Sequence, residues 1–285
     1  MKKQFGFTLI ELLVIISIVG LVSSVALANL NEARKRAQIS AGIQQEISIR
    51  NAAGDSMVGE WSFNGSPGVA TVATDTSGNG NDGTIVNGSF VEPGSNGSGS
   101  AVYLGGPGAY VTGTGIASGN NENTTVTAWV NPNEITDARS IFNSGYDGFL
   151  NYSLAISSGG IITRTQNFLA PVPEDCDVCE GSSLIKNNVW TFVATTFSDS
   201  GEINIYTNGT LAQTYSGIPT VGASGSNTRW TIGALSSNGG GTSATENFSG
   251  LIDEVRVYRG TNPFAASDIH RLYTQELEAR KFANI

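Results

Sequence analysis

The spacing of hydrophobic and polar positions changes along the chain and separates an N-terminal helical part from a strand-rich part. Residues 7–28 are apolar except for one threonine, one glutamate and three serines. A helix that crosses a bilayer needs about 20 such residues. Residues 29–53 continue at helical spacing with charges between the apolar positions. We therefore predict one long helix over residues 7–53, with a transmembrane part at about 7–28.

From residue 59 onward, short alternating apolar runs predict strands, and Gly, Ser, Asn and Thr separate them as turns. Asn208-Gly209, between two such runs, predicts a hairpin. About a dozen short strands favour a mainly β fold, an antiparallel two-sheet sandwich or jelly roll. The expected strands are 59–63, 83–88, 101–105, 109–113, 125–132, 140–145, 151–157, 160–166, 190–197, 202–215, 228–235 and 248–258.

A short C-terminal helix follows the last predicted strand. Asn262 is a favourable N-cap and Pro263 suits the first helical position. Ile269, Leu272 and Tyr273 then form an apolar face.

Charge is unevenly distributed over the 285 residues, whose net charge is -9. Residues 1–53 carry six Lys/Arg and three Glu, and the remainder carries nine Lys/Arg and twenty-one Asp/Glu. An acidic globular part argues against nucleic acid as a partner and leaves room for cations or neutral ligands.

Cys176 and Cys179 are the two cysteines of the chain, and His270 is its one histidine. These residues are too few for a four-ligand zinc site, and a thioredoxin-like site would need a βαβ context. Two interpretations stay open, a small disulfide loop in an oxidising compartment or two free thiols.

Glu11 places a carboxylate inside the apolar run, where ionisable groups are rare and usually functional. The segment Gly6-Phe7-Thr8-Leu9-Ile10-Glu11 resembles the processing motif of type IV prepilins and pseudopilins. The resemblance implies that a prepilin peptidase cuts after Gly6 and that the amine of Phe7 is methylated. It also implies that Glu11 meets the N-terminal amine of a neighbouring pilin subunit, a buried pair that fixes register. The alternative is a signal anchor that tolerates a glutamate.

Two further stretches, GEWSFNGSPGVATVATDTSGNGNDGTI at 59–85 and FSGLIDEVRVY at 248–258, resemble those of laminin-G-like (concanavalin A-like) jelly rolls. The match spans about residues 57–275. The family often binds Ca²⁺ and glycans, so the resemblance implies a binding domain of this kind.

The loop that begins at Asp75 has the composition of a calcium loop, because oxygen side chains alternate there and glycines permit a tight turn. The predicted ligands are Asp75, Asn79 and Asn81, joined by Asp253 from the last strand. Alternatively, the loop residues cap a turn and Asp253 accepts bonds from backbone amides.

Asp253 is expected on the same strand face as Leu251, Val255 and Val257, where a carboxylate needs a partner or a metal. The first and last strands should be neighbours, which would bring Asp253 toward the Asp75 loop. One departure weakens the prediction, since family members commonly carry two acids where this chain has Asn64-Gly65.

Catalysis is not expected. Retaining glycosidases place two carboxylates about 5–5.5 Å apart, whereas Asp253 and Glu254 are adjacent and should point to opposite faces of a strand. His270 is expected on the surface of the C-terminal helix without a nucleophile nearby.

The predicted organisation is a leader (1–6), a pilin-type helix (7–53), a linker (54–58), a jelly-roll domain (59–275) and a tail (276–285). The favoured function is a minor or tip pilin-like subunit, stored in the cytoplasmic membrane and then displayed at the cell surface. Its globular domain would bind a glycan for adhesion. The alternatives are a pseudopilin of a type II secretion system and a surface-anchored glycoside hydrolase.

Overall fold

The computed structural model describes two compact units, which we treat separately: Met1–Ser48 and Ile49–Ile285. We refer to the second unit as the head. The described residues are 9–24, 34, 56–116, 123–135, 138–145, 152–157, 160–164, 179–181, 185–218, 228–235, 246–260 and 264–283.

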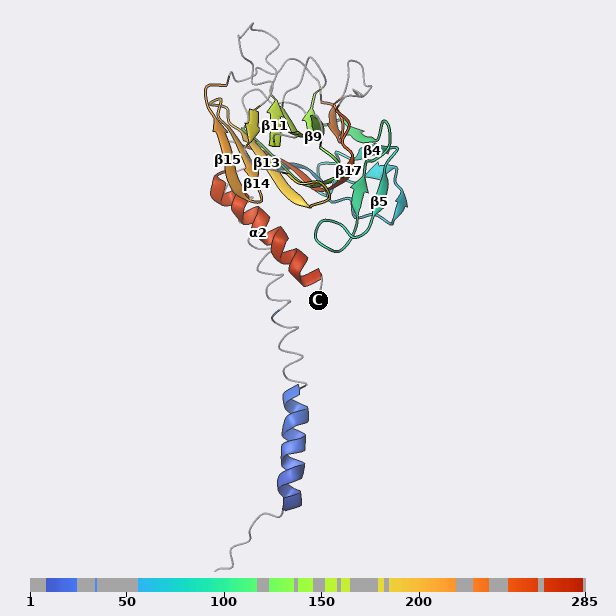
Figure 1. The fold of residues 1–285 in the computed structure, drawn as a ribbon, viewed down its shortest axis with the longest axis vertical. Coiled ribbons are helices and arrows are strands. Elements are labelled where there is room, and N and C mark those ends of the chain that lie inside the picture. Colours follow the sequence, from blue (N-terminus) through green and yellow to red (C-terminus); the bar gives the residue numbers. More distant parts are fainter. Residues whose placement is uncertain are drawn as a thin grey trace, which may run out of the picture. The chain divides into compact units, whose positions relative to one another are not determined.

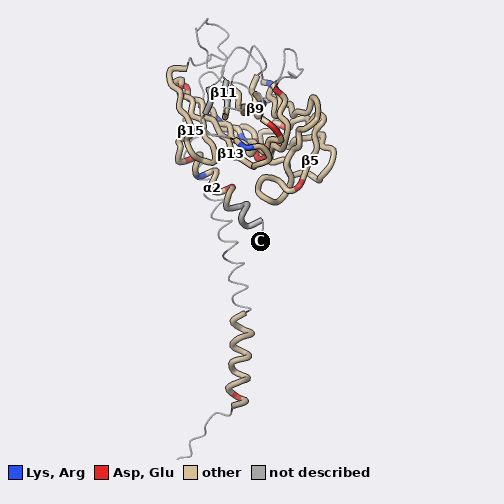
Figure 2. The backbone as a smooth tube through the Cα atoms, in the orientation of Figure 1, with Lys and Arg blue, Asp and Glu red and all other residues tan. Residues whose placement is uncertain are grey.

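In the first unit, residues 9–24 form an α-helix whose side chains are all exposed (Figure 1). Its hydroxyls bond within the helix, because Ser17 Oγ donates to the Leu13 carbonyl and Ser24 Oγ to the Leu21 carbonyl, each over 2.8 Å. The helix therefore presents an apolar surface with one acidic position (Figure 2). The predicted span 7–28 extends beyond these residues at both ends. Among the described residues, no helix combines the length and the apolar character that a membrane crossing requires.

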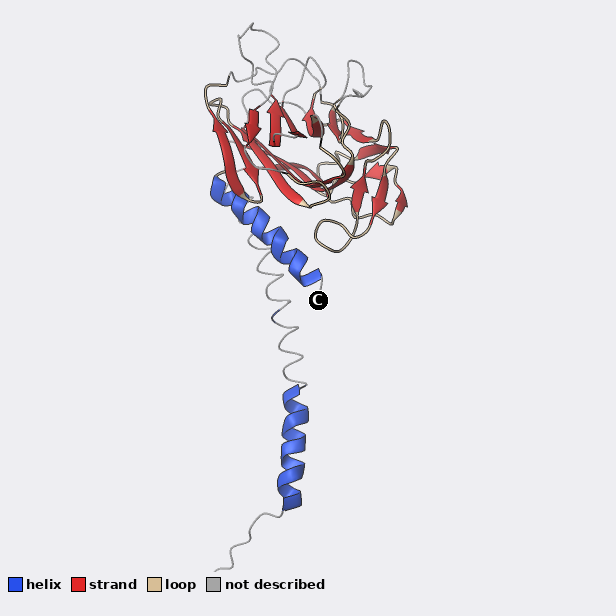
Figure 3. Cartoon of the chain, in the orientation of Figure 1, coloured by secondary structure: helices blue, strands red, loops and turns tan. Residues whose placement is uncertain are grey.

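The head is a sandwich of two antiparallel sheets, which confirms the predicted fold class (Figure 3). Every expected strand is present, and among the strands that the structure describes the sequence pattern missed four short ones, β2, β3, β5 and β12. The strands are β1 (Ser56–Trp61), β2 (Gly68–Val69), β3 (Val72–Ala73), β4 (Gly83–Val86), β5 (Ser89–Val91), β6 (Ala101–Tyr103), β7 (Tyr110–Gly113), β8 (Asn123–Pro132), β9 (Arg139–Ser144), β10 (Tyr152–Ser157), β11 (Gly160–Arg164), β12 (Cys179–Gly181), β13 (Thr191–Phe197), β14 (Ile203–Thr207), β15 (Thr210–Tyr215), β16 (Trp230–Ile232) and β17 (Gly250–Gly260).

The nine-stranded sheet has the order β15-β14-β13-β8-β17-β6-β5-β2, and β1 also pairs with β17. One edge of β17 follows β8, and the other meets β6 at its start and β1 over the rest. The predicted contact of first and last strands is thus confirmed. The eight-stranded sheet has the order β12-β11-β10-β9-β16-β7-β4-β3. The hairpin at Asn208-Gly209 is also confirmed, with φ angles of 49° and 71° at the two turn residues.

The main core lies between the two sheets and is centred on aromatic rings. The ring centroid of Trp61 is 4.3 Å from that of Trp230 and 6.1 Å from that of Phe142. Gly83 and Gly113 make room for the Trp230 indole, because a Cβ on either would lie 2.6 or 2.3 Å from its atoms. Larger residues at these two positions would displace the indole.

A second apolar cluster covers the outer face of the nine-stranded sheet beneath helix α2 (Ala266–Ala283). Figure 1 shows α2 lying along the strands β13, β14 and β15. Its buried residues include Ile269 and Leu272, so the predicted apolar face is confirmed. The helix begins later than predicted, at Ala266, where the Ala265 amide donates to Asp268 Oδ2 over 3.0 Å. Asn262 and Pro263 lie outside the described residues.

The strand β17 contains a bulge that the alternating pattern did not reveal. Its pairing with β8 shifts between Asp253 and Arg256, and Glu254 has a φ of 49°. Ile252 and Val255 therefore both enter the main core, although three positions separate them. The expectation that Asp253 continues the alternation of Val255 and Val257 was wrong, because the extra residue changes the face.

Candidate functional site

Of the residues predicted to act in processing and assembly, Glu11 lies in the described helix 9–24 and Gly6 and Phe7 lie outside the described residues. Leu9, Leu12 and Leu13 near Glu11 are 81, 59 and 53 % exposed. An apolar surface of this kind requires lipid or neighbouring helices for burial.

The Asp75 carboxylate organises its loop by accepting three backbone amide hydrogen bonds. Oδ1 accepts from Glu60 and Ser77 over 3.0 and 2.9 Å, and Oδ2 accepts from Asn81 over 2.8 Å. Burial alone would raise the pKa of Asp75, but the Ser77 side chain and these amides hold it below its ordinary value. Both oxygens therefore have partners from the protein itself.

The two asparagines of the same loop fasten it to β1. Asn79 Nδ2 donates to the Met57 carbonyl over 2.7 Å, and Asn81 Nδ2 donates to the Val58 carbonyl over 2.6 Å. The backbone carbonyl of Asn81 accepts from Trp61 Nε1 over 3.1 Å. The loop is thus tied to the strand that carries the central tryptophan of the core.

Asp253 has its partners in a different loop. Its Oδ2 accepts from the Ser95 amide over 2.7 Å, and its Oδ1 accepts from the Glu254 amide over 2.9 Å. The side chain is 2 % exposed, and burial raises its pKa to about 6. The hydrogen bonds of Asp253 join β17 to the segment before β6, whereas those of Asp75 join its loop to β1.

The predicted metal ligands thus take part in backbone hydrogen bonds in two separate loops. Within the part of the chain that the structure describes, no group of three or more His, Cys, Asp or Glu side chains is arranged to hold a metal ion. Calcium binding stays a prediction. The disulfide also stays a prediction, because Cys176 and the side chain of Cys179 lie outside the described residues.

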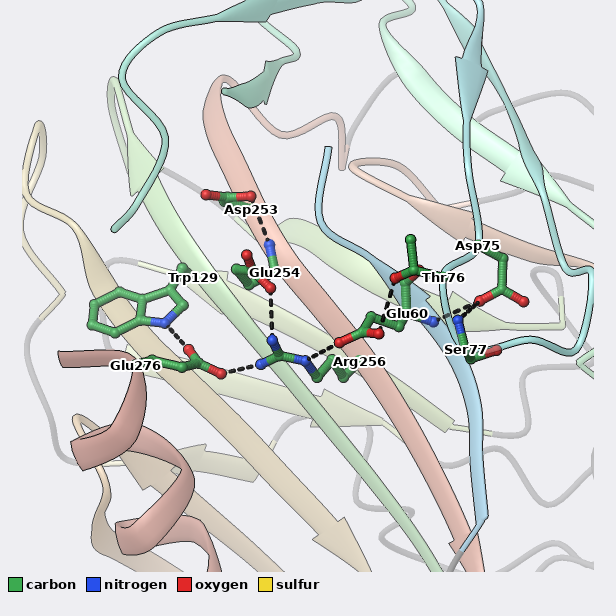
Figure 4. A network of polar contacts seen from close by, with 9 residues as sticks. All are labelled: Glu60, Asp75, Thr76, Ser77, Trp129, Asp253, Glu254, Arg256 and Glu276. Carbon is green, nitrogen blue, oxygen red and sulfur yellow. Dashed lines mark hydrogen bonds and ion pairs between the residues drawn. The ribbon is translucent and has the colours of Figure 1, made fainter. Parts of the chain in front are cut away.

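A cluster around Arg256, which the sequence reasoning missed, joins four elements of the head (Figure 4). Arg256 Nε donates to Glu60 Oε1 of β1 over 2.8 Å, and Nη2 donates to Glu254 Oε2 over 2.7 Å. Nη1 donates to Glu276 of α2, which also accepts from Trp129 Nε1 of β8. We call these five residues the Arg256 cluster.

The side chains of Arg256, Glu60, Glu254 and Glu276 are 12–16 % exposed. Burial raises the pKa of Glu254, Arg256 opposes this rise, and the carboxylates of Glu276, Asp253 and Glu60 add to it. Burial alone would lower the pKa of Arg256, but the carboxylates around it raise the value above the ordinary one. The cluster therefore holds parts of the head together through buried charge pairs.

The adjacent acids Asp253 and Glu254 have separate roles, one on backbone amides and one on Arg256. His270 lies on α2 with its Nδ1 3.3 Å from the Gly209 carbonyl of the β14–β15 turn. Neither arrangement resembles the pair of facing carboxylates that a glycosidase needs.

Comparison with protein families identifies the superfamily of the head and a motif at the start of the chain. A family profile described as the concanavalin A-like lectin/glucanases superfamily matches residues 104–266. The chain belongs to this superfamily. A second profile, the prokaryotic N-terminal methylation motif, matches residues 1–27. A search of curated proteins found no match.

Solved structures with the same fold as this superfamily member include domain 4 of AbnA, a GH43 extracellular arabinanase from Geobacillus stearothermophilus, in complex with arabinotriose. It is 20 % identical, with a TM-score of 0.56 over 77 % of this chain and 99 % of that one. The botulinum neurotoxin serotype D binding domain is 17 % identical, with a TM-score of 0.55 over 77 % of this chain and 51 % of that one. The binding domain of Paraclostridial Mosquitocidal Protein 1 is 13 % identical, with a TM-score of 0.56 over 76 % and 52 %. This chain spans about half of the two toxin domains, and the likeness concerns the fold alone.

Proposed function

We propose that the protein is a pilin-like subunit, of the minor or tip kind, that displays a glycan-binding head for adhesion. The observation that carries the proposal is the presence, in one chain, of a prokaryotic N-terminal methylation motif and a concanavalin A-like sandwich. The motif implies processing by a prepilin peptidase, membrane storage of the precursor and assembly with other pilin subunits.

The helix supplies the physical basis for assembly. Its exposed leucines, isoleucines and valines gain free energy when neighbouring helices cover them. A carboxylate at Glu11 within such a bundle requires a cation, and the methylated amine of Phe7 on the next subunit would provide one. A helix of this kind assembles only in the register that joins the two charges.

A glycan ligand is favoured by the fold of the head. The structure of domain 4 of the arabinanase is of a complex with arabinotriose, and that of a botulinum neurotoxin serotype D ligand binding domain is of a complex with N-acetylneuraminic acid. Asp75 and Asp253 accept hydrogen bonds from backbone amides, and Glu254 pairs with Arg256, which supports a binding role for this part of the head.

The decisive experiment has two parts. Intact mass of the protein purified from its native membrane or filaments should give a chain that begins with N-methylated Phe7. A chain that begins at Met1 or is cut near Ala28 would contradict the pilin assignment. Residues 49–285, the unit with its own core, should then be screened on a glycan array with and without EDTA, and the same glycans should be tested for hydrolysis. Binding without turnover is expected, whereas turnover would favour the surface-anchored hydrolase.

A further inference from the structure

The helix α2 contacts the head through one short pattern of side chains. Ile269 and Leu272 are buried, Tyr273 packs beside them, and Glu276 reaches Arg256 and Trp129. These four positions have the spacing i, i+3, i+4 and i+7, the spacing by which an amphipathic helix occupies a groove. A single face of one helix therefore makes these contacts.

The surface that receives α2 consists of residues from the sheet, and we call it the helix seat. Its aromatic part is Trp129 and Phe192, against which Tyr273 of α2 packs, with ring centroids 5.6–5.9 Å apart among the three. At one end Gly209 lies so close that an added Cβ would be 2.8 Å from Tyr273 Cβ. The other sheet residues of the seat are Met57, Ala194, Tyr206, Arg256 and Tyr258.

Arg256, the charged residue of the helix seat, is held in place by residues of the sheet as well as by α2. Glu60 and Glu254, both from the sheet, hold two of the three guanidinium nitrogens of Arg256. The third, Nη1, points to Glu276 (Figure 4). The guanidinium is thus positioned before the helix arrives, which reduces the ordering that binding requires.

The helix is also separate from the main core. Among the described residues, those of α2 belong to the outer apolar cluster, and the cluster between the two sheets contains none of them. Elements that contribute few contacts to a main core open as units of low local stability. The sandwich can accordingly retain its core when α2 leaves.

We propose that α2 is an exchangeable strap and that the helix seat can take the α2 of a second copy of this chain. The sequence that fits the seat is present in every copy, and subunits held side by side would supply it at high local concentration. Exchange of an identical element between protomers adds no new contact and so requires no new surface. The exchanged helix would bring its glutamate to Arg256 of the neighbouring copy.

The test uses the full chain in detergent and a fluorescent peptide of residues 264–283. A chain with Leu272→Ala and Glu276→Ala keeps every sheet residue of the seat but weakens its own helix. It should bind the wild-type peptide, and a Glu276→Ala peptide should bind at least about thirtyfold more weakly, because a buried charge loses its partner. The wild-type chain should bind little peptide, since its own α2 competes for the helix seat at about millimolar effective concentration. A Glu134→Ala chain, which loses a surface charge but keeps the wild-type α2, is the control and should behave in the same way.

Trypsin provides the second measurement. Cleavage after Arg271 should be faster in the doubly substituted chain than in the control, because the weakened helix leaves the helix seat more often. The near-ultraviolet dichroism of the tryptophans should persist in that chain. Loss of this signal would mean that the sandwich unfolds with the helix, and equal affinity for the two peptides would mean that Arg256 does not select its partner. Either result, or no binding of the wild-type peptide, overturns the proposal.

Discussion

Glu60 and Arg256 lie opposite each other in the antiparallel pairing of β1 with β17, and Arg256 Nε donates to Glu60 Oε1 over 2.8 Å. The two residues are 196 positions apart. This pair ties the first strand of the head to its last, and Glu276 extends the connection to the C-terminal helix. The predictions that follow begin with this cluster.

Replacing Arg256 by methionine should destabilise the head by about 3–5 kcal/mol, because three largely buried carboxylates lose a shared cation. For a domain of this size, a loss of 1 kcal/mol lowers the melting temperature by about 2–4 °C. Thermal unfolding of residues 49–285 measures the effect. Arg271→Met is the matched control, since its nitrogen is 3.9 Å from Asp268 and its side chain is 38 % exposed. The control should change stability by about 1 kcal/mol or less. Equal effects of the two substitutions would contradict the importance of the cluster.

The contribution of Asp253 and Glu254 to the stability of the head should fall as the pH rises, because the pKa of each is raised in the folded state. Below the pKa values that the two carboxyl groups have in the unfolded chain, near pH 4, both groups are protonated in the folded and the unfolded state. Their contribution to the stability is then fully present. For Asp253 the loss should occur between about pH 4 and its folded value of about 6 and amount to about 3 kcal/mol. Glu254 should extend the loss to higher pH.

Glu254→Gln isolates the second contribution, since glutamine keeps an acceptor for Arg256 but does not ionise. Melting temperatures between pH 4.5 and 9 should show a flatter alkaline side in this variant than in the wild type. Asp253→Asn should instead change the acidic side. An unchanged pH profile in Glu254→Gln would show that another group governs the alkaline loss.

Glu11→Ala should leave membrane insertion intact or improve it, because a charge is removed from the apolar segment. Filament assembly should weaken or fail, since the amine of a neighbouring Phe7 loses its partner. Ser24→Ala is the control, because the Ser24 hydroxyl bonds within its own helix. Sedimentation of sheared filaments measures assembly. Wild-type assembly by Glu11→Ala would remove the ion-pair explanation.

If the predicted Ca²⁺ site exists, added Ca²⁺ should raise the melting temperature of residues 49–285. The stabilisation is about 2.7 kcal/mol at a hundredfold excess over Kd. Asp75→Ala and Asp253→Ala should abolish the rise and also lower the metal-free stability, because each aspartate holds backbone amides. If Ca²⁺ does not shift the melting temperature of the wild type and elemental analysis finds no bound metal, the calcium site is absent. The Asp75 loop is then a capped turn, and Asp253 is an aspartate that binds backbone amides.

Cys176 and Cys179 should form an intramolecular bridge if the head is exported. A bridge across so short a loop stabilises the fold little, since its loop-closure contribution grows with loop length. Thiol labelling of the untreated protein under denaturing conditions is the measurement. Two reactive thiols would indicate that the bridge is absent.

The sequence by itself determined the local features of this protein. The period of apolar residues located the strands and the face of α2, because side chains alternate in strands and recur every three to four residues in helices. Asn208-Gly209 specified its turn, since both positions need a positive φ. The prepilin motif could also be identified from the sequence, because its residues are adjacent in the chain.

Only the tertiary structure decided which distant groups meet. The bulge at Glu254 changes the side of β17 on which the following side chains lie, and no glycine in the sequence marks it. Asp253 therefore accepts a hydrogen bond from the Ser95 amide and does not continue the core pattern of Val255 and Val257. Glu60, Arg256 and Glu276 meet only because the fold brings β1, β17 and α2 together. A periodic pattern states which face of an element is buried, but the partner across that face follows from sheet order and register, which depend on the whole chain.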